Sequence, residues 1–111
     1  MQHEMHLAKN PFEKIRNRTK TIESRLFDDK RKLINHGDVI LFRQSDDESQ
    51  EVKTEVIAVL RYDSFNDLMT AFPPAMFGGN STGELLTEIR QFYSEHDEKK
   101  YGVVGIKIVR I

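Results

Sequence analysis

Three segments rich in β-branched residues, at 38–42, 52–62 and 101–111, most constrain what this chain can fold into. The first, DVILF, and the apolar middle of the second, VKTEVIAVLRY, present apolar side chains on both faces of an extended strand. Such runs are typical of strands that are buried on both sides or lie in a barrel. The third, YGVVGIKIVRI, is remote in sequence from the other two, so we expect the sheet to recruit a late strand.

Two more segments near the start of the chain are predicted to be strands. Residues 2–8, QHEMHLA, alternate, with His3, Met5 and Leu7 on the inward face. Residues 19–26, TKTIESRL, also alternate. The segment 35–38, NHGD, is a turn in which Gly37 is free to adopt a positive φ. Residues 43–51, RQSDDESQE, are predicted to form an acidic surface loop.

Three short helices are predicted between these strands. NPFEKIRN (10–17) has Asn10 as its cap and Pro11 at its first position. SFNDLMTAF (64–72) and STGELLTEIRQFYS (81–94) each open with a capping box. About five strands, interleaved irregularly with about three short helices, favour an α+β fold or a small closed barrel over a doubly wound sheet. In the long strand 52–62, alternation places Val52, Val56, Ala58 and Leu60 on one face.

Length and composition indicate one domain over residues 1–111. The chain has no cysteine, which excludes disulfides and thiolate zinc sites. No apolar run approaches the ~20 residues needed to span a bilayer, and MQHEMHLAKN lacks a signal-peptide core. We therefore expect a soluble, cytoplasmic protein that needs no cofactor and has no membrane partner.

The charge is balanced overall but unevenly distributed. The net charge is −1, yet residues 9–32 contain nine Lys or Arg and four Asp or Glu. This excess of five positive charges is compatible with a local basic face on an acidic body. The alternative is a solvated surface whose charges serve solubility.

Metal binding is not expected. His3 and His6 are three residues apart, but on a strand odd and even positions face opposite sides. His36 falls in a turn and His96 in a predicted acidic loop. No phosphate-loop, dinucleotide-binding or nucleophile-elbow pattern is present. Helical spacing assigns four aromatic residues to the core: Phe65, Phe72, Phe92 and Tyr93.

The segment RTKTIESR, residues 18–25, concentrates opposite charges at Lys20, Glu23 and Arg25. An ideal strand would place Lys20 on one face and the other two on the opposite face. A bulge, a bend or a helix–strand transition is needed to bring the three together. If these three residues form a functional site, we expect their charged groups to lie in a cleft and to have shifted pKa values. The alternative is a structural ion network that pins the strand to nearby helices.

This segment resembles the signature of the ASCH domain family, in which a glycine is followed by Lys two residues on, Glu three later and Arg two later again. Lys20, Glu23 and Arg25 match the charged positions, while Arg18 stands in place of the glycine. The resemblance covers essentially the whole chain, from HEMHL and PFEKI through RLFDDKR and GDVILF to KYGVVGIKI. It implies a PUA-like β-barrel, with the motif in a cleft between barrel and helices, into which the preceding helix delivers Lys20 before regular strand pairing begins.

The resemblance also implies a ligand. Family members bind RNA or nucleotides; some small bacterial ones remove the acetyl group from N4-acetylcytidine, and others cut single-stranded RNA. In a binding module, Lys20 and Arg25 would contact phosphate or base, Glu23 would orient them, and Arg31 and Tyr101 would line the rim. The run Lys30–Lys32 is otherwise interpreted as a solvated charge cluster.

An enzyme would use Lys20 as base, with Thr21 or Glu23 assisting. The N4-acetylcytidine amidohydrolases carry a threonine nucleophile where this chain has Glu23, which disfavours that activity. They also use a further glutamate, for which Glu84 is the nearest candidate here, although a capping box explains it equally well. A third class, a protein-interaction adaptor, predicts no pocket at residues 20–25.

Overall fold

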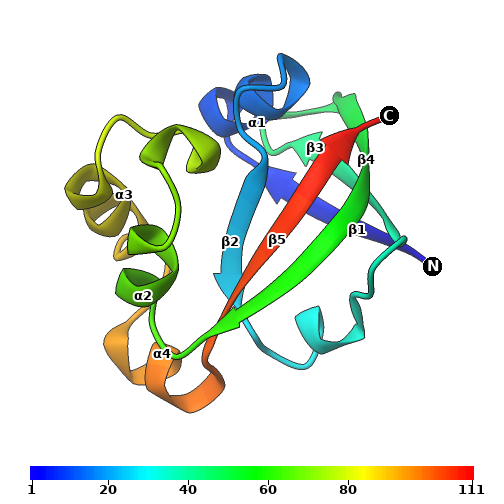
Figure 1. Ribbon diagram of the computed structural model, residues 1–111. Coiled ribbons are helices and arrows are strands. Elements are labelled where there is room, and N and C mark those ends of the chain that lie inside the picture. Colours follow the sequence, from blue (N-terminus) through cyan, green and yellow to red (C-terminus); the bar gives the residue numbers. More distant parts are fainter.

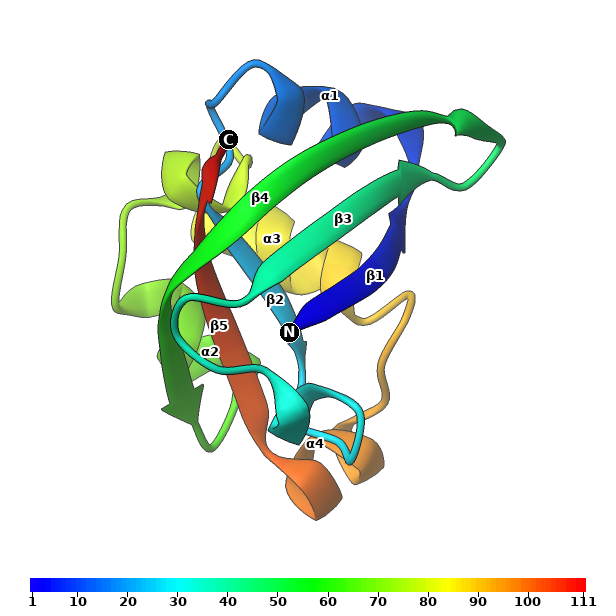
Figure 2. The same cartoon turned by 90° about the vertical axis from the view of Figure 1, so that its right-hand side faces the viewer.

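The computed structural model describes all 111 residues, and its centre is one five-stranded sheet. The strands are β1 (Gln2–Leu7), β2 (Ile22–Leu26), β3 (Val39–Gln44), β4 (Asp47–Tyr62) and β5 (Val103–Arg110). Their order across the sheet is β1-β3-β4-β5-β2, with β1 parallel to β3 and every other neighbouring pair antiparallel. The sheet curls into a half-barrel, and β4 bends along its length to follow the curl (Figures 1 and 2).

Four α-helices surround this sheet: α1 (Lys9–Arg16), α2 (Phe65–Thr70), α3 (Thr82–Ile89) and α4 (Glu95–Tyr101). Two short 3₁₀ helices, η1 (Arg31–Leu33) and η2 (Pro74–Phe77), complete the structure. α1 lies across one end of the curl, whereas α2, α3 and α4 gather on one side of the sheet, beside β2 and β5 (Figure 1). No helix is long and apolar enough to cross a membrane.

Two hydrophobic cores follow from this arrangement. The inner core lies within the curl under α1 and includes Met5, Leu7, Phe12, Ile15, Ile34, Ile40, Phe42, Val52, Val56, Val104, Ile106 and Ile108. The outer core joins the other face of β2 and β5 to the helices and includes Ile22, Leu26, Phe65, Leu68, Met69, Phe77, Leu85 and Val103. Strand β5 therefore supplies Val104, Ile106 and Ile108 to the inner core and Val103 to the outer core, which explains why its first half is apolar on both faces.

A glycine lets a helix approach β5 closely. A Cβ atom at Gly105 would lie 2.7 Å from Cδ1 of Leu68 on α2. Because Leu68 is fully buried, a larger residue at position 105 would separate the helix from the strand.

The α+β class and the five strands are confirmed. The predicted inward face of β1 is also confirmed, since Met5 and Leu7 are buried and His3 is partly buried. The turn at 35–38 is present, with Gly37 at φ 88°. Helix α1 buries Phe12 and Ile15 but begins at Lys9 with Ala8 as its N-cap residue, so the predicted cap at Asn10 is wrong.

Two boundary predictions are wrong. Residues 47–51 belong to β4, not to a loop, because only a tight turn at Ser45 and Asp46 separates it from β3. The segment 81–94 is not one helix: α3 ends at Ile89, and a separate α4 begins at Glu95. The fourth helix begins with its own cap, in which the Ser94 hydroxyl accepts a hydrogen bond from the Asp97 amide at 3.1 Å.

The predicted face of β4 is wrong beyond its midpoint. Val52 and Val56 do share the inner core, but the register with β5 shifts between Val56 and Ala58. This bulge adds one residue, Ile57, to the strand, so Val59 rather than Ala58 packs against the inner core. A strict alternation cannot anticipate an inserted residue.

Candidate functional site: a cleft at the open seam of the half-barrel

The edge strands β1 and β2 do not pair with each other, and a side chain bridges the seam between them. On β2, Arg25 donates a hydrogen bond from Nη2 to the backbone oxygen of His6 on β1, at 3.1 Å. Its Nε and Nη2 also donate to Oε2 of Glu23, at 3.3 and 3.1 Å. Arg25 therefore connects the two edges of the sheet to a carboxylate on its own strand.

The chain enters β2 through an irregular turn that sets the position of Lys20. After α1, Arg18 adopts a left-handed conformation with φ 70°. The amides of Thr19 and Lys20 then both donate to the Lys14 backbone oxygen, at 2.9 Å. Regular pairing with β5 begins only at Ile22, so Lys20 is outside the strand alternation. This is the helix–strand transition that the sequence required for the three charges to meet.

The three charged side chains converge. Lys20 donates from Nζ to Oε1 of Glu23 at 3.0 Å, while Arg25 holds the other carboxylate oxygen. The side chains of Glu23, Lys20 and Arg25 are only 5%, 10% and 15% exposed. The Ser24 amide also donates to Oε1 of Glu23 at 3.0 Å. The carboxylate is thus buried with a cation on each side.

The surroundings of Glu23 keep it ionised. Burial acts to raise its pKa, but the charges of Lys20 and Arg25 and the hydrogen bonds they donate outweigh burial, and the pKa falls to about 2. Burial likewise acts to lower the pKa of Arg25, but Glu23 and the nearby phenol of Tyr93 raise it above its usual value. At neutral pH Glu23 is therefore a fixed hydrogen-bond acceptor between two fixed donors.

These residues line a cleft of about 420 Å³ between the seam, α1, η2 and α3. Its lining includes three Lys or Arg residues (Lys14, Lys20, Arg25) and three glutamates (Glu23, Glu84, Glu88). The lining is therefore charge-balanced, not basic as the sequence suggested. Apolar contributions come from Leu7, Pro11, Met69, Phe77, Leu85, Ile89, Phe92 and Tyr93.

Two aromatic residues from the segment between α3 and α4 border the cleft. The ring of Tyr93 stacks on Phe65 of α2, with centroids 5.6 Å apart and planes at 14°. The side of Tyr93 near Arg25 contributes to the cleft. Phe92 is 73% exposed, so it is not the core residue that helical spacing predicted. An exposed aromatic ring beside buried polar groups offers a flat ligand a surface to stack on.

The remaining residues proposed from sequence lie elsewhere. Thr21 does not line the cleft; with Lys20 it lines a second, smaller cavity of about 170 Å³. Arg31 pairs with Asp28 at 2.9 Å, and Tyr101 packs against the outer core, and neither lines the cleft. Glu84 does line the cleft, and its amide donates to the capping hydroxyl of Ser81. It is therefore both a cleft residue and a capping-box residue.

Sequence reasoning missed Lys14 and Tyr93. Lys14 extends from α1 and donates from Nζ to the backbone oxygen of Gly78, joining α1 to the loop after η2. A Cβ atom at Gly78 would lie 3.2 Å from the Lys14 side chain and 3.3 Å from that of Lys20, so the glycine makes room for both. Nothing in the local pattern of α1 distinguishes Lys14 from a solvated lysine.

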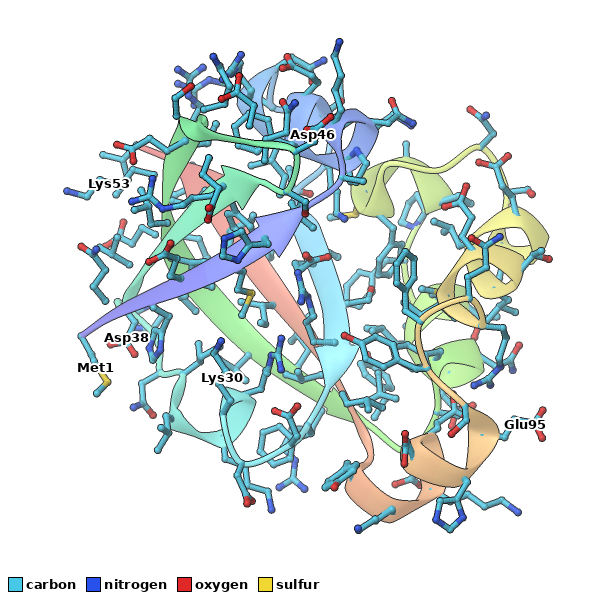
Figure 3. All side chains as sticks on the ribbon, turned by 180° about the vertical axis from the view of Figure 1, so that it is seen from behind. Met1, Lys30, Asp38, Asp46, Lys53 and Glu95 are labelled. Atoms are coloured by element: carbon cyan, nitrogen blue, oxygen red, sulfur yellow. The ribbon has the colours of Figure 1, made fainter.

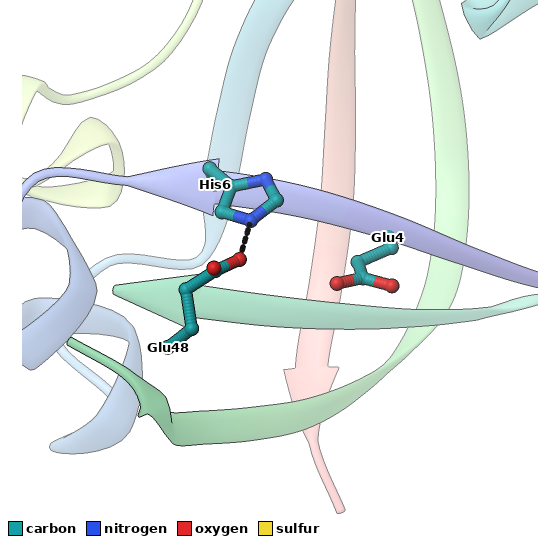
Figure 4. A group of neighbouring side chains, drawn as sticks. All are labelled: Glu4, His6 and Glu48. Atoms are coloured by element: carbon teal, nitrogen blue, oxygen red, sulfur yellow. Dashed lines mark hydrogen bonds and ion pairs between the residues drawn. The ribbon is translucent and has the colours of Figure 1, made fainter. Parts of the chain in front are cut away.

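The histidines of β1 face apart, as predicted. His3 donates or accepts at 2.8 Å with Asp38, which lies beside Met1 at the start of β1 (Figure 3). His6 contacts Glu48 at 2.7 Å, and Glu4 lies nearby on the same strand (Figure 4). All three residues of this cluster are exposed, and Glu4 already pairs with Arg43. A metal ion there would compete with Arg43 for Glu4.

Comparison with known proteins assigns the chain to a family. The model of the ASCH domain matches residues 5–111, almost the entire chain. This protein belongs to the ASCH domain family. ASCH domains have a PUA-like α+β fold, and the family is generally linked to RNA binding. A search of curated proteins returned no match.

Solved structures that are similar to this chain match nearly its whole length. The crystal structure of hypothetical protein PH0355 is 38% identical, covers 100% of both chains and has a TM-score of 0.89. The solution structure of PF0455 from Pyrococcus furiosus is also 38% identical, with a TM-score of 0.75, and covers 100% of this chain and 98% of its own. The ASCH domain of Lactobacillus crispatus is 13% identical, with a TM-score of 0.67, and matches 98% of this chain and 79% of its own, which shows a shared fold.

Proposed function

We propose that the cleft binds the nucleoside part of a nucleotide or of single-stranded RNA. One observation carries the proposal: the buried Glu23 carboxylate is held between Lys20 and Arg25 at the wall of a cleft large enough for such a ligand. A buried, ordered set of charged donors and acceptors is costly for stability alone, so its place in a cleft indicates a site. The link of the ASCH family to RNA binding supports the same ligand class.

The balanced charge of the cleft favours a base over a phosphate. With as many glutamates as Lys and Arg residues in the lining, the cleft has little net attraction for an anion. A nucleobase is neutral, flat and edged with donors and acceptors, which matches fixed polar groups beside the exposed ring of Phe92. Glu23 would accept from an exocyclic amine, and Lys20 and Arg25 would donate to ring or carbonyl acceptors.

The test is a binding measurement with matched variants. Titration calorimetry with cytidine and fluorescence anisotropy with a labelled hexacytidylate RNA should both give saturable binding. Lys20→Ala should weaken both by roughly tenfold or more, because a charge-assisted hydrogen bond contributes about 1.5–3 kcal/mol. Lys30→Ala, which removes an exposed lysine with no ion pair, should leave cytidine binding unchanged. Equal affinities for wild type and Lys20→Ala would contradict the proposal.

A second candidate function is hydrolysis of a modified nucleoside such as N4-acetylcytidine, or of single-stranded RNA. It is favoured by one observation: a lysine, Lys20, and two carboxylates, Glu23 and Glu84, line the same cleft. With its pKa near 2, Glu23 would orient Lys20 and not transfer a proton. Acetate released from N4-acetylcytidine by wild type, and lost in Lys20→Ala and Glu84→Gln, would establish this activity. Bound but unchanged ligand would leave the protein a binding module.

A further inference from the structure

The second cavity carries a different kind of lining from the cleft. It has a volume of about 170 Å³ and lies where the turn after α1 meets the end of β5. Three of its polar residues are cationic, Arg18, Lys20 and Arg110, and the fourth is Thr21. The others are aliphatic, and none is acidic. Because Lys20 is already paired with Glu23, the unbalanced charges of this cavity are those of Arg18 and Arg110.

The two guanidinium groups have no anionic partner. None of the ion pairs in the structure involves Arg18 or Arg110. Arg18 donates from Nη1 to the backbone oxygen of Arg110 at 3.3 Å, and Arg110 donates from Nη1 to that of Arg16 at 2.8 Å. Because a guanidinium has five N–H donors, each retains most of its donors for a ligand. Both arginines are exposed, and these backbone contacts leave their charges unneutralised.

The backbone conformation of Arg18 also supports a functional role for its side chain. This residue has φ 70°, a conformation that glycine adopts freely and that residues with a side chain rarely adopt. Residues with strained backbone conformations cluster at ligand-binding and catalytic sites. At Arg18, the side chain supplies one of the two unpaired guanidinium groups.

The two cavities are adjacent. Lys20 lines both of them, and the next residue, Thr21, lines the second. The Thr21 amide is bound to the Met76 backbone oxygen at 2.8 Å, and its own oxygen accepts from the Ile108 amide at 2.9 Å, which holds this segment in place. A ligand that reaches from the cleft to Arg18 and Arg110 would have to pass over the Lys20 side chain.

We propose that Arg18 and Arg110 form a phosphate subsite for the ligand whose nucleoside part occupies the cleft. This inference rests on the proposed function and adds to it where the phosphate goes. Arginine guanidinium groups bind phosphate oxygens through paired N–H donors, and the hydroxyl of Thr21 offers a further donor in the same cavity. The cleft supplies recognition of the base, and the second cavity supplies the attraction for the anion that the cleft lacks.

The test compares charge-removing variants across three ligands. Arg18→Gln and Arg110→Gln should each weaken hexacytidylate RNA roughly tenfold and lower the slope of log Kd against log salt by about one. Cytidine, which has no phosphate, should bind both variants as it binds wild type. Cytidine 5′-monophosphate distinguishes the source of the phosphate. If the arginine variants also bind this nucleotide more weakly than wild type, the phosphate of the bound nucleotide itself occupies the subsite. If only their affinity for RNA falls, the phosphate belongs to the adjoining nucleotide.

The control is Lys30→Gln, which removes the same charge beyond the opposite end of β2 (Figure 3). If Lys30→Gln lowers RNA affinity as much as Arg18→Gln, the effect is general electrostatics and the subsite is overturned. If Arg18→Gln and Arg110→Gln bind RNA like wild type while Lys20→Ala does not, the subsite is overturned and the cleft proposal stands. If cytidine fails to bind but RNA responds to both arginine variants, the cleft proposal fails and the phosphate site stands. If RNA binds neither the wild type nor any variant, the cleft proposal and the phosphate subsite are both overturned.

Discussion

At the scale of single residues, the cleft depends on Glu23. Its carboxylate is almost fully buried and is the shared partner of Lys20 and Arg25. Without it, two cations would lie side by side with little solvent to screen them. Arg25 would also lose the contacts that hold it in position to reach His6 across the seam. The same residue thus orders the ligand-facing groups and the edge of the half-barrel.

The low pKa of Glu23 predicts how stability depends on pH. The group has a pKa of about 2 in the folded protein against 4.5 for the unperturbed carboxyl. A lowered folded-state pKa contributes stability that is fully present above pH 4.5 and is lost as the pH falls toward 2. Urea denaturation should therefore show a loss of about 2 kcal/mol from Glu23 between pH 6 and pH 3.

Glu23→Gln isolates this contribution, because Asp38, whose pKa is also lowered to about 2, titrates equally in both proteins. The variant should be less stable than wild type by about 3 kcal/mol at pH 6, and the difference should shrink at pH 3. A difference that stays constant across this range would mean that the Glu23 carboxylate is not stabilised by its two cations.

At the scale of helices and strands, the sequence predicts elements with regular periodicity better than those set by local irregularity. Alternation and β-branched content place β1, β3 and β5, and capping boxes place the starts of α2 and α3. The bulge at Ile57 and the two-residue turn at Ser45 and Asp46 were missed, because both depend on pairing with a neighbouring strand.

Helix α4 was missed for a different reason. Its start carries the same signal as α2 and α3, a serine followed three residues later by an acid, at Ser94 and Asp97. The predicted helix 81–94 was instead extended as far as Ser94, the residue that caps α4. Helix α4 positions Glu98, which accepts from the Phe65 amide at 2.9 Å and pairs with Arg90. The short helix therefore links the start of α2 to the C-terminal end of α3.

This account predicts that the cap of α4 is structural and separate from the cleft. Ser94→Ala should lower the free energy of unfolding by about 1 kcal/mol, because the Asp97 amide loses its acceptor. Ser94→Asp, which retains a capping oxygen, should restore most of that loss. Chemical denaturation measures both variants, and unchanged cytidine affinity in Ser94→Ala would separate the cap from the site. A stability equal to wild type in Ser94→Ala would mean that α4 does not depend on this cap.

At the scale of the whole molecule, the site exists because the sheet stops short of closing. β1 and β2 come from opposite ends of the strand order, and the gap between them becomes a cleft walled by α1 and α3. The sequence motif identified Lys20, Glu23 and Arg25, since three charges within six residues stand out locally. Lys14, Tyr93 and Phe92 come from segments that only the tertiary fold brings to the cleft, and no local pattern marks them.

The measurement that tests the central claim most directly is an NMR titration of isotope-labelled protein with hexacytidylate RNA. It reports where on the molecule the ligand binds, independently of any variant. The account predicts saturable shifts of amides along the seam: residues 6–8 at the end of β1, 18–25 around β2, 77–80 after η2, and 84–93 through α3. Saturable shifts confined to another surface, or none at all, would contradict the assignment of the cleft as the nucleic-acid site.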